Sequence, residues 1–351
     1  MSKPLVIDEF LEKAKQFPVL DVRTPAEFSK GHIPGAINLP LFSDEERVII
    51  GTLYIKQGRK ESMKKGLDFV GPKMRSFIEK TEEITGVNNS VLVHCWRGGM
   101  RSGSVAHLLD LYGFNTFTLQ KGYKAFRKWV LNSFTIPKKL IVLGGKTGAG
   151  KTETLWEMEK LGAYIIDLEK LAHHKGSAFG AIGEAEQPTQ EQFENDLAIA
   201  WRNTPGNEPV WLEDESRMIG KKIIPAGVWE QMQLANVLYL NLPFGKRVEN
   251  LVRIYGEFDT HKIEGSINQI QKRLGNEAWK QALEGLHNND AKTTTEILLK
   301  YYDKAYQHGI DVREKEKVFY FEPKTNDVKV IARELLNLPI ITEYANGSKT
   351  H

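Results

Sequence analysis

Cys95 is the only cysteine among 351 residues, and its neighbours indicate that its thiol could do chemistry. The apolar residues 91–93 lead into it and predict a short buried strand. Gly98 and Gly99 then permit a tight turn, and the pattern from Ser102 onward predicts the start of a helix. Cys95 therefore stands between a strand end and a helix N-terminus, where unpaired backbone N–H groups favour a thiolate or a bound oxyanion.

Two arginines strengthen this prediction. Arg97 and Arg101 place positive charge near the thiol, and such surroundings lower a thiol pKa from about 8.5 toward a range of about 3.5–7.5. We therefore predict that Cys95 is a reactive nucleophile and not a buried structural cysteine, and that Cys95, Arg97 and Arg101 together form the catalytic group.

A second stretch predicts phosphate binding. An apolar strand at 140–143 runs into the pattern G-x-x-x-x-G-K-T, and a helix is predicted after it, which is the context that a P-loop requires. Its glycines let backbone N–H groups surround phosphates, Lys151 neutralises them, and the Thr152 hydroxyl can ligate Mg²⁺. The predicted phosphate-binding residues are Gly145, Lys146, Thr147, Gly148, Ala149, Gly150, Lys151 and Thr152.

Acidic residues follow two further apolar strands. Asp167 ends one of them, and Glu213 and Asp214 end the other. Carboxylates in such places near a P-loop commonly hold the metal ion or its waters, and we favour Glu213 and Asp214 equally for that role. Lys175 and Ser177 lie in a loop of basic, small and aromatic residues and are predicted to contact substrate.

Strand and helix patterns alternate around these motifs, which predicts an α/β fold with parallel sheets. Residues 1–134 are predicted to form the domain of Cys95, with a helical segment over 43–83 that breaks at Gly66 and at Gly71-Pro72. Residues 138–351 are predicted to form the P-loop domain.

The P-loop domain is predicted to end in a helical extension over about 243–310. Basic residues alternate there with aromatic ones, which suits RNA through phosphate contacts and base stacking. The same pattern also fits an ordinary solvated helical face over core aromatics. The residues concerned are Lys272, Arg273, Lys280, Lys300, Lys304, Trp279, Tyr301, Tyr302 and Tyr306.

Two motifs upstream of Cys95 resemble the rhodanese family. They are residues 21–28, Asp-Val-Arg-Thr-Pro-Ala-Glu-Phe, and residues 31–38, Gly-His-Ile-Pro-Gly-Ala-Ile-Asn. The resemblance implies a rhodanese-like domain, in which the cysteine carries sulfur or selenium as a persulfide or perselenide.

The cysteine loop also fits a different signature, H-C-x-x-G-x-x-R-[ST] of the cysteine phosphatases, which begins here at His94. Both classes place a thiolate beneath N–H groups and an arginine on an oxyanion. A phosphatase further needs a general acid, for which Asp21 and Glu27 are candidates. The alternative functions are therefore a rhodanese-fold cysteine phosphatase with a regulatory nucleotide-binding domain, or a non-catalytic RNA-binding or nucleotide-gated adaptor.

A chalcogen-carrying thiol joined to a P-loop domain resembles the tRNA 2-selenouridine synthase family, and the resemblance covers essentially the whole chain. Lys175 stands where an arginine is more usual, and both side chains are cations. The motifs that carry the resemblance are residues 93–102, 144–152, 167–169, 175–180, 213–217 and 301–303.

The resemblance implies a transferase that converts wobble 2-thiouridine in tRNA to 2-selenouridine. Geranyl diphosphate, bound by the P-loop, first alkylates the sulfur, and selenophosphate from selenophosphate synthetase then provides selenium. Our working hypothesis is that Cys95 takes selenium as a perselenide, and the alternative is that the loop binds selenophosphate while Cys95 positions or activates it. Apart from Mg²⁺, no cofactor is expected. Candidates by residue type for an apolar geranyl slot are Phe179, Trp211, Trp229, Met232 and Leu234.

Composition restricts the class of protein further. Hydrophobic and charged contents of 41% and 26% are ordinary for a globular protein. One cysteine excludes an intrachain disulfide, no apolar run reaches the length of a membrane span, and a signal-peptide pattern is missing, so we expect a cytoplasmic protein. A net charge of +3 permits a local RNA-binding patch without arguing for one.

Overall fold

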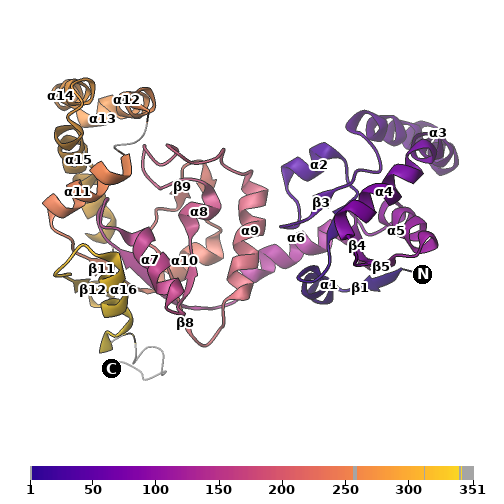
Figure 1. Ribbon diagram of the computed structural model, residues 1–351, viewed down its shortest axis with the longest axis horizontal. Helices are drawn as coiled ribbons and strands as arrows, with labels where there is room; N and C mark the ends of the chain where they lie inside the picture. The colour runs from indigo at the N-terminus through magenta and orange to yellow at the C-terminus, as the bar shows by residue number, and fades with distance from the viewer. Residues whose placement is uncertain (1, 256–258, 312, 340, 342–351) are drawn as a thin grey trace. The chain divides into compact units, whose positions relative to one another are not determined.

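The computed structural model describes residues 2–255, 259–311, 313–339 and 341. The chain divides into two compact units, which we call the cysteine unit and the P-loop unit (Figure 1). The cysteine unit comprises residues 1–133 and 194–199, and the P-loop unit comprises residues 134–193 and 200–351. Each unit is built on its own five-stranded parallel sheet flanked by helices, so the predicted α/β fold is confirmed.

The sheet of the cysteine unit has the strand order β1-β5-β4-β2-β3. Its strands are β1 (Lys3–Leu5), β2 (Val19–Asp21), β3 (Ile37–Asn38), β4 (Ser90–His94) and β5 (Asn115–Leu119). Its helices are α1 (Ile7–Ala14), α2 (Pro25–Lys30), α3 (Asp44–Val70), the 3-10 turn η1 (Gly71–Lys73), α4 (Met74–Thr85), α5 (Met100–Tyr112) and α6 (Gly122–Ser133). Alternate residues of central strand β4 face the two layers of helices: Val91 and Val93 pack toward α4 and α5, and His94 packs toward Phe10 of α1.

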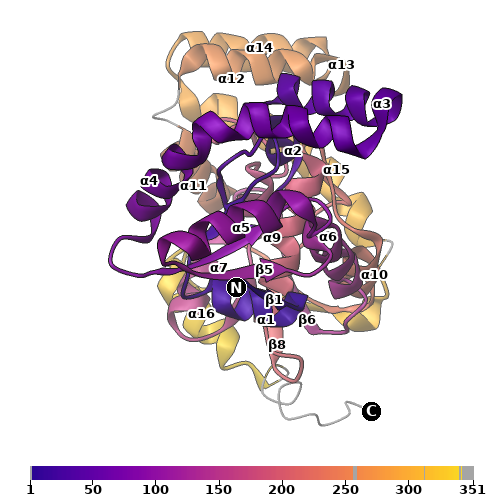
Figure 2. The same ribbon diagram turned by 90° about the vertical axis from the view of Figure 1, so that its right-hand side faces the viewer.

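Helix α3 corrects one prediction. The chain stays helical through Gly66, which is buried with its backbone close to Phe42 and Ile50, so the predicted break there is wrong. The bend lies instead at Gly58, whose φ of 83° belongs to a backbone region that glycine adopts freely. Figure 2 shows the two halves of α3 side by side, as the approach of Gly66 to Ile50 requires. The predicted break at Gly71-Pro72 is the short turn η1.

The sheet of the P-loop unit has the order β12-β11-β6-β8-β7. Its strands are β6 (Lys139–Gly144), β7 (Tyr164–Ile166), β8 (Pro209–Glu213), β11 (Asn236–Leu240) and β12 (Val318–Phe321), and a separate hairpin joins β9 (Met218–Ile219) to β10 (Lys222–Ile223). Helices α7 (Lys151–Lys160) and α16 (Val328–Leu336) pack together on one face of the sheet. The other helices near it are α8 (Leu168–Ala172), α9 (Gln190–Asn203), α10 (Ala226–Leu234) and the short turn η2 (Lys315–Lys317).

The predicted helical extension is present in the described residues, but it is more divided than the sequence suggested. It consists of α11 (Phe244–Tyr255), α12 (Thr260–Gln269), α13 (Gln271–Leu274), α14 (Asn276–His287) and α15 (Ala291–Asp311). The part of the extension at 256–258 lies outside the described residues. Figure 1 shows α12, α13 and α14 grouped beyond α11 and α15. None of the helices in the described part of the chain combines the length and apolar character needed to span a membrane.

Candidate functional site

The Cys95 thiol lies at the carboxyl end of β4, where parallel sheets of this kind place their functional loops. Its side chain is almost fully buried, and its Sγ lies 3.2 Å from the Ser102 hydroxyl oxygen. Burial alone would raise the pKa of the thiol. Hydrogen bonds from the Ser102 hydroxyl and from the backbone N–H groups of Gly99, Ser102 and Arg97 outweigh that effect and lower it. The loop is therefore a cradle that stabilises a thiolate.

The cradle is held in shape by the turn that leads into α6. The backbone N–H groups of Tyr123 and Lys124 donate to the carbonyls of Cys95 and Trp96 at 2.8 and 3.0 Å. Gly122 lies so close to the loop that a Cβ there would stand 2.1 Å from the Cys95 carbonyl oxygen. The loop carbonyls thus point to α6, which leaves the loop N–H groups directed at the thiol.

The two predicted arginines differ in their surroundings. Arg101 is half-buried, interacts electrostatically with Cys95, and forms a bidentate ion pair with Glu27 at 2.6 and 3.1 Å. Glu27 in turn belongs to the capping box of α2 with Thr24. Arg97 is exposed on the loop surface. Sequence alone missed Glu27 as the residue that orients Arg101, because the two lie far apart in the chain.

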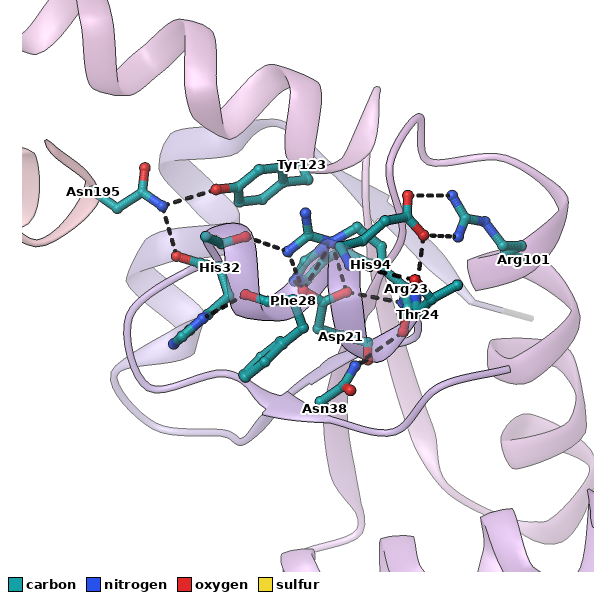
Figure 3. A network of polar contacts seen from close by, with 12 residues as sticks. Asp21, Arg23, Thr24, Phe28, His32, Asn38, His94, Arg101, Tyr123 and Asn195 are labelled. Carbon is teal, nitrogen blue, oxygen red and sulfur yellow. Dashed lines mark hydrogen bonds and ion pairs between the residues drawn. The ribbon is translucent and has the colours of Figure 1, made fainter. Parts of the chain in front are cut away.

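A buried polar network supports the base of the loop (Figure 3). Arg23 donates from Nε to both Asp21 carboxylate oxygens at 3.0 and 2.9 Å, and its guanidinium stacks 3.7 Å from the centre of the Tyr123 ring. Burial opposes the charged form of Asp21, but the charge of His94 and the hydrogen bonds of Arg23 lower its pKa. Arg23 dominates near neutral pH, because His94 is then uncharged. Asp21 is therefore a structural anion beneath the cysteine loop.

His94, the residue before Cys95, makes the stability of the cysteine unit depend on pH. Its ring is fully buried, and desolvation lowers its pKa from 6.5 to about 4, with the nearby Asp21 carboxylate opposing the shift. The unfolded chain binds the proton first, so we expect the free energy of unfolding to fall by about 2–3 kcal/mol as the pH drops from 6.5 to 4. Hydrogen-exchange labelling of the β4 peptide, in protein equilibrated in urea at each pH, measures that energy.

The control for this prediction is His94→Gln, which cannot titrate. Its unfolding free energy should change less than that of the wild type between pH 6.5 and 4, since the buried imidazole of residue 94 is removed while every other titrating group is the same in the two proteins. If the unfolding free energy depends on pH equally in the two proteins, His94 is not the source of that dependence.

The P-loop of the second unit connects β6 to α7 and has the positive φ angles that its glycines allow. The Lys151 ammonium donates to the Gly145 carbonyl at 2.9 Å, and the Thr152 hydroxyl donates to Glu169 at 3.1 Å. Lys146 lies 3.9 Å from Asp303 of α15. All the predicted phosphate-binding residues from Thr147 to Thr152 line one cavity of about 880 Å³, a size suited to a small-molecule ligand.

Helix α11 braces this loop, which the sequence did not reveal. Arg247 is buried, donates to the Thr147 carbonyl at 3.2 Å and forms a bidentate ion pair with Asp303. Asn250 donates to the Gly148 carbonyl at 3.0 Å. Gly148 approaches α11 so closely that a Cβ would lie 2.9 Å from the Arg247 carbonyl oxygen. The three-residue spacing of Arg247 and Asn250 was a signal for a shared face, and that face supports the P-loop.

The predicted acidic residues near the P-loop differ in their contacts and burial. Asp214 forms an ion pair with Arg313 at 2.6 Å, and Asp167 caps α8 and accepts a hydrogen bond from Trp156. Glu213 is fully buried. Desolvation raises its pKa well above the usual value, and the charges of Asp167 and Glu169 raise it further.

Two carboxylates that the sequence analysis did not select face the P-loop more directly. Desolvation raises the pKa of Glu169 and raises that of Glu215 well above its usual value, while the nearby Lys151 charge opposes both shifts. Gly176 approaches Glu215 so closely that a Cβ would stand 2.5 Å from its carboxylate. Their position after β7 and β8, next to the acids that were chosen, was the available signal.

Lys175 and Ser177 line the same cavity as the P-loop. The Lys175 ammonium lies 3.1 Å from Glu184, and the Ser177 hydroxyl accepts from the Phe179 N–H at 3.2 Å. The loop that contains them therefore forms part of the wall of the P-loop cavity.

A second, mainly apolar pocket adjoins the cavity and shares with it Thr147, Ser177, Leu251 and Tyr302. Its other walls include Phe179, Val252, Ile263, Leu286, Leu298 and Leu299. Of the five residues named by type for an apolar slot, Phe179 alone lines it. Trp211 and Met232 are buried in the core, Trp229 is not in its wall, and Leu234 is largely exposed.

The aromatic residues of the helical extension lie mostly inside it. Trp279, Tyr301 and Tyr302 pack against a buried cluster with Phe179 and Ile267. The side chain of Tyr306 lies outside the described residues. These contacts favour the interpretation that the basic residues form a solvated helical face and that the aromatic residues belong to the core beneath it.

Comparisons with known proteins agree with this architecture. The family description "tRNA 2-selenouridine synthase AAA domain" matches residues 138–337, and "Rhodanese-like domain" matches residues 6–128. A tRNA 2-selenouridine synthase from Shewanella denitrificans is 32% identical over 86% of this chain and 90% of its own, and one from Hydrogenovibrio crunogenus is 33% identical over 86% and 91%. The N-terminal domain of a Clostridium difficile protein, named for ATP or GTP binding, is 39% identical over 37% of this chain and 99% of its own, with a TM-score of 0.34.

A cysteine loop on one parallel sheet and a P-loop on another define a rhodanese-like unit joined to a P-loop unit. The length of chain covered by these matches and their sequence identity also define the particular family. The chain belongs to the tRNA 2-selenouridine synthase family.

Proposed function

We propose that this protein converts 2-thiouridine at the wobble position of tRNA to 2-selenouridine, by way of S-geranyl-2-thiouridine. The observation that carries the proposal is the pairing, in one chain, of a cysteine thiolate cradle with a P-loop cavity that opens onto an apolar pocket. A hydrocarbon chain attached to a diphosphate needs an apolar pocket of this kind beside the phosphate site.

In the first step the thiouridine sulfur attacks C1 of geranyl diphosphate. The C1–O bond breaks, diphosphate leaves, and N3 of the base loses a proton. Lys151 and the P-loop N–H groups stabilise the charge that develops on the leaving diphosphate, and the apolar pocket holds the geranyl chain. S-Alkylation makes the sulfur a better leaving group for the second step.

Mg²⁺ fits the acidic side of the P-loop. Among the described residues no group of three or more His, Cys, Asp or Glu side chains is arranged to hold a metal ion alone, but Mg²⁺ usually takes one or two carboxylates, waters and substrate phosphates. Buried Glu213 has one carboxylate oxygen without a hydrogen-bond partner among the described residues. Thr152, Glu169 and Glu215 would hold the ion, which would neutralise diphosphate charge.

In the second step the selenium atom of selenophosphate attacks C2, the C2–S bond breaks, and geranyl thiol leaves with a proton. The base then carries a C2–Se–P linkage. Attack of the Cys95 thiolate on phosphorus breaks the Se–P bond, leaves C2=Se after N3 regains a proton, and forms an S–P bond that water hydrolyses to phosphate. This route balances without an oxidant, whereas a perselenide on Cys95 would need an electron acceptor to form its S–Se bond from fully reduced selenium.

The phosphatase alternative receives less support from the cysteine unit. It has two candidate general acids. Burial opposes the charged form of Glu27, but its ion pair with Arg101 lowers its pKa. The pKa of Asp21 is lowered as well. Both are therefore ionised near neutral pH and neither has a proton to give to a leaving group.

The direct test is incubation of the full chain with tRNA that contains 2-thiouridine, first with geranyl diphosphate and then with selenophosphate. Mass spectrometry of the nucleosides should find S-geranyl-2-thiouridine and then 2-selenouridine. Turnover of an aryl phosphate with no change in the tRNA would instead support the phosphatase.

The apolar pocket provides a further prediction. Thr295 lines it and is half-buried. We expect Thr295→Trp to fill the pocket and raise the KM for geranyl diphosphate by about tenfold or more, which corresponds to the loss of roughly two buried methylene groups. Inhibition by inorganic diphosphate should be unchanged, because that anion needs only the P-loop. If the variant binds geranyl diphosphate and inorganic diphosphate more weakly by the same factor, the geranyl chain lies elsewhere.

A further inference from the structure

An exposed basic segment spans the bend of helix α3 at Gly58. The chemistry above does not use it. We call residues 56–65 the basic tip. Five cations and one acid lie in this segment, around the bend at Gly58. Four of the cations are exposed and Lys65 is half-buried. The cations are Lys56, Arg59, Lys60, Lys64 and Lys65, and the acid is Glu61.

The basic tip reaches the cysteine loop. The Arg59 guanidinium lies 3.5 Å from the sulfur of Met100, the first residue of α5. Met100 follows Gly99, whose N–H group donates to the Cys95 thiol. The tip is therefore next to the cradle and within the same unit.

Other exposed cations lie in the loop and in the turn that packs against it. Arg97 lies in the loop itself, and Lys121 and Lys124 belong to the turn that packs against it. A surface with this charge attracts a polyanion and not a small neutral molecule, because several cations spread over it can each meet a phosphate.

Exposed apolar side chains adjoin the basic tip. Tyr54 is 59% exposed and Ile55 is 85% exposed. Exposed aromatic and cationic side chains in one segment suit single-stranded RNA, whose unpaired bases stack on aromatic rings while its phosphates meet the cations. The aromatics of the helical extension, by contrast, are mostly packed inside it.

We propose that the basic tip of α3, with Tyr54, binds the single-stranded loop of an RNA hairpin and so holds a target base over the Cys95 cradle. This proposal rests on the proposed function, in which the base that receives selenium is in the anticodon loop of tRNA. It assigns the RNA contact to the cysteine unit and gives α3 a role that neither chemical step explains.

Binding of a fluorescent anticodon stem-loop RNA to the full chain, followed by anisotropy at several salt concentrations, tests the proposal. Lys56 and Lys60 are exposed on either side of Gly58, so K56E/K60E should fold. We expect its Kd to rise about tenfold or more at low salt, and the slope of log Kd against log salt to fall by about one to two. Tyr54→Ala should raise the Kd about fivefold with little change in that slope, and Tyr54→Phe should restore it.

The matched control is K3E/K15E, which makes the same change in charge at the first residue of β1 and at the C-terminal cap of α1, outside the Cys95 loop and the basic tip. Its Kd should equal that of the wild type. An unchanged Kd for K56E/K60E, or an equal loss in the control, would overturn the proposal. A third result would also overturn it: the wild type forms a dimer without RNA, and K56E/K60E loses the dimer but keeps its Kd for RNA. The tip would then join two copies of the chain.

The same variants separate this proposal from the proposed function. A wild-type protein that binds the stem-loop through the tip but makes no 2-selenouridine would refute the function and keep the RNA site. A K56E/K60E protein that binds RNA and makes 2-selenouridine as the wild type does would refute the RNA site and keep the function.

Discussion

Replacing Cys95 by serine is expected to reduce 2-selenouridine formation by more than about a thousandfold while S-geranyl-2-thiouridine still forms. The reason is that the cysteine cradle and the P-loop lie in different units, each with its own sheet. A serine hydroxyl does not ionise at neutral pH, so the nucleophile is lost while the side chain keeps nearly the same size. Nucleoside mass spectrometry of tRNA after each step measures both activities.

The nucleoside that accumulates in Cys95→Ser also distinguishes two mechanisms. Attack of the thiolate on phosphorus predicts a base that retains the C2–Se–P linkage, whereas a perselenide carrier predicts that the reaction stops at S-geranyl-2-thiouridine. Intact-mass analysis of the wild type under turnover should show phosphate on Cys95, without the isotope pattern of selenium. Loss of geranylation as well, in a folded variant, would refute the division of labour between the units.

Ser102→Ala is the matched control because it leaves the thiol in place. The Ser102 hydroxyl is the leading hydrogen-bond contribution that lowers the pKa of Cys95. Without it the pKa should rise, so selenation should decline at neutral pH and recover as the pH increases. A variant whose activity stays low at every pH would indicate that Ser102 acts otherwise than through the thiolate.

Replacing Lys151 by alanine is expected to lower the rate of geranylation by at least about a hundredfold, since it removes a cation that stabilises the departing diphosphate. The loss should appear in kcat as well as in KM, because the charge on diphosphate grows in the transition state. Lys151 is also near Glu169 and Glu215, so the variant loses the cation that offsets their charge. Steady-state kinetics with geranyl diphosphate measures the effect.

Lys146→Ala provides the comparison within the same loop. Its ammonium lies 3.9 Å from Asp303 and is partly exposed, so we expect a loss well below that of Lys151→Ala. Selenation of tRNA that already carries S-geranyl-2-thiouridine should be normal in both variants. Unchanged geranylation in Lys151→Ala would refute the assignment of the P-loop to the diphosphate.

The agreement between sequence and structure is best where a pattern is local. The capping box of Thr24 and Glu27 and the strand before Cys95 could all be predicted, because each depends on residues within a few positions of one another. The bend of α3 could not, because the helix contains three glycines, Gly51, Gly58 and Gly66, at which a bend could lie. Gly66 stays helical since its face packs closely against Phe42 and Ile50, and only the tertiary fold brings these residues together.

The sequence by itself determined the two chemical stretches, their attachment to parallel strands, and the family resemblance, since motif spacing and hydrophobic period survive without a fold. The tertiary structure alone decided which side chains serve them. It paired Arg101 with Glu27, placed Arg247 beneath the P-loop, and set Glu169 beside Thr152. It also paired Asp214 with Arg313 at the wall of the P-loop cavity. Hydrogen bonds and ion pairs act over a few ångströms in space, and spacing along a chain does not report which distant residues will meet.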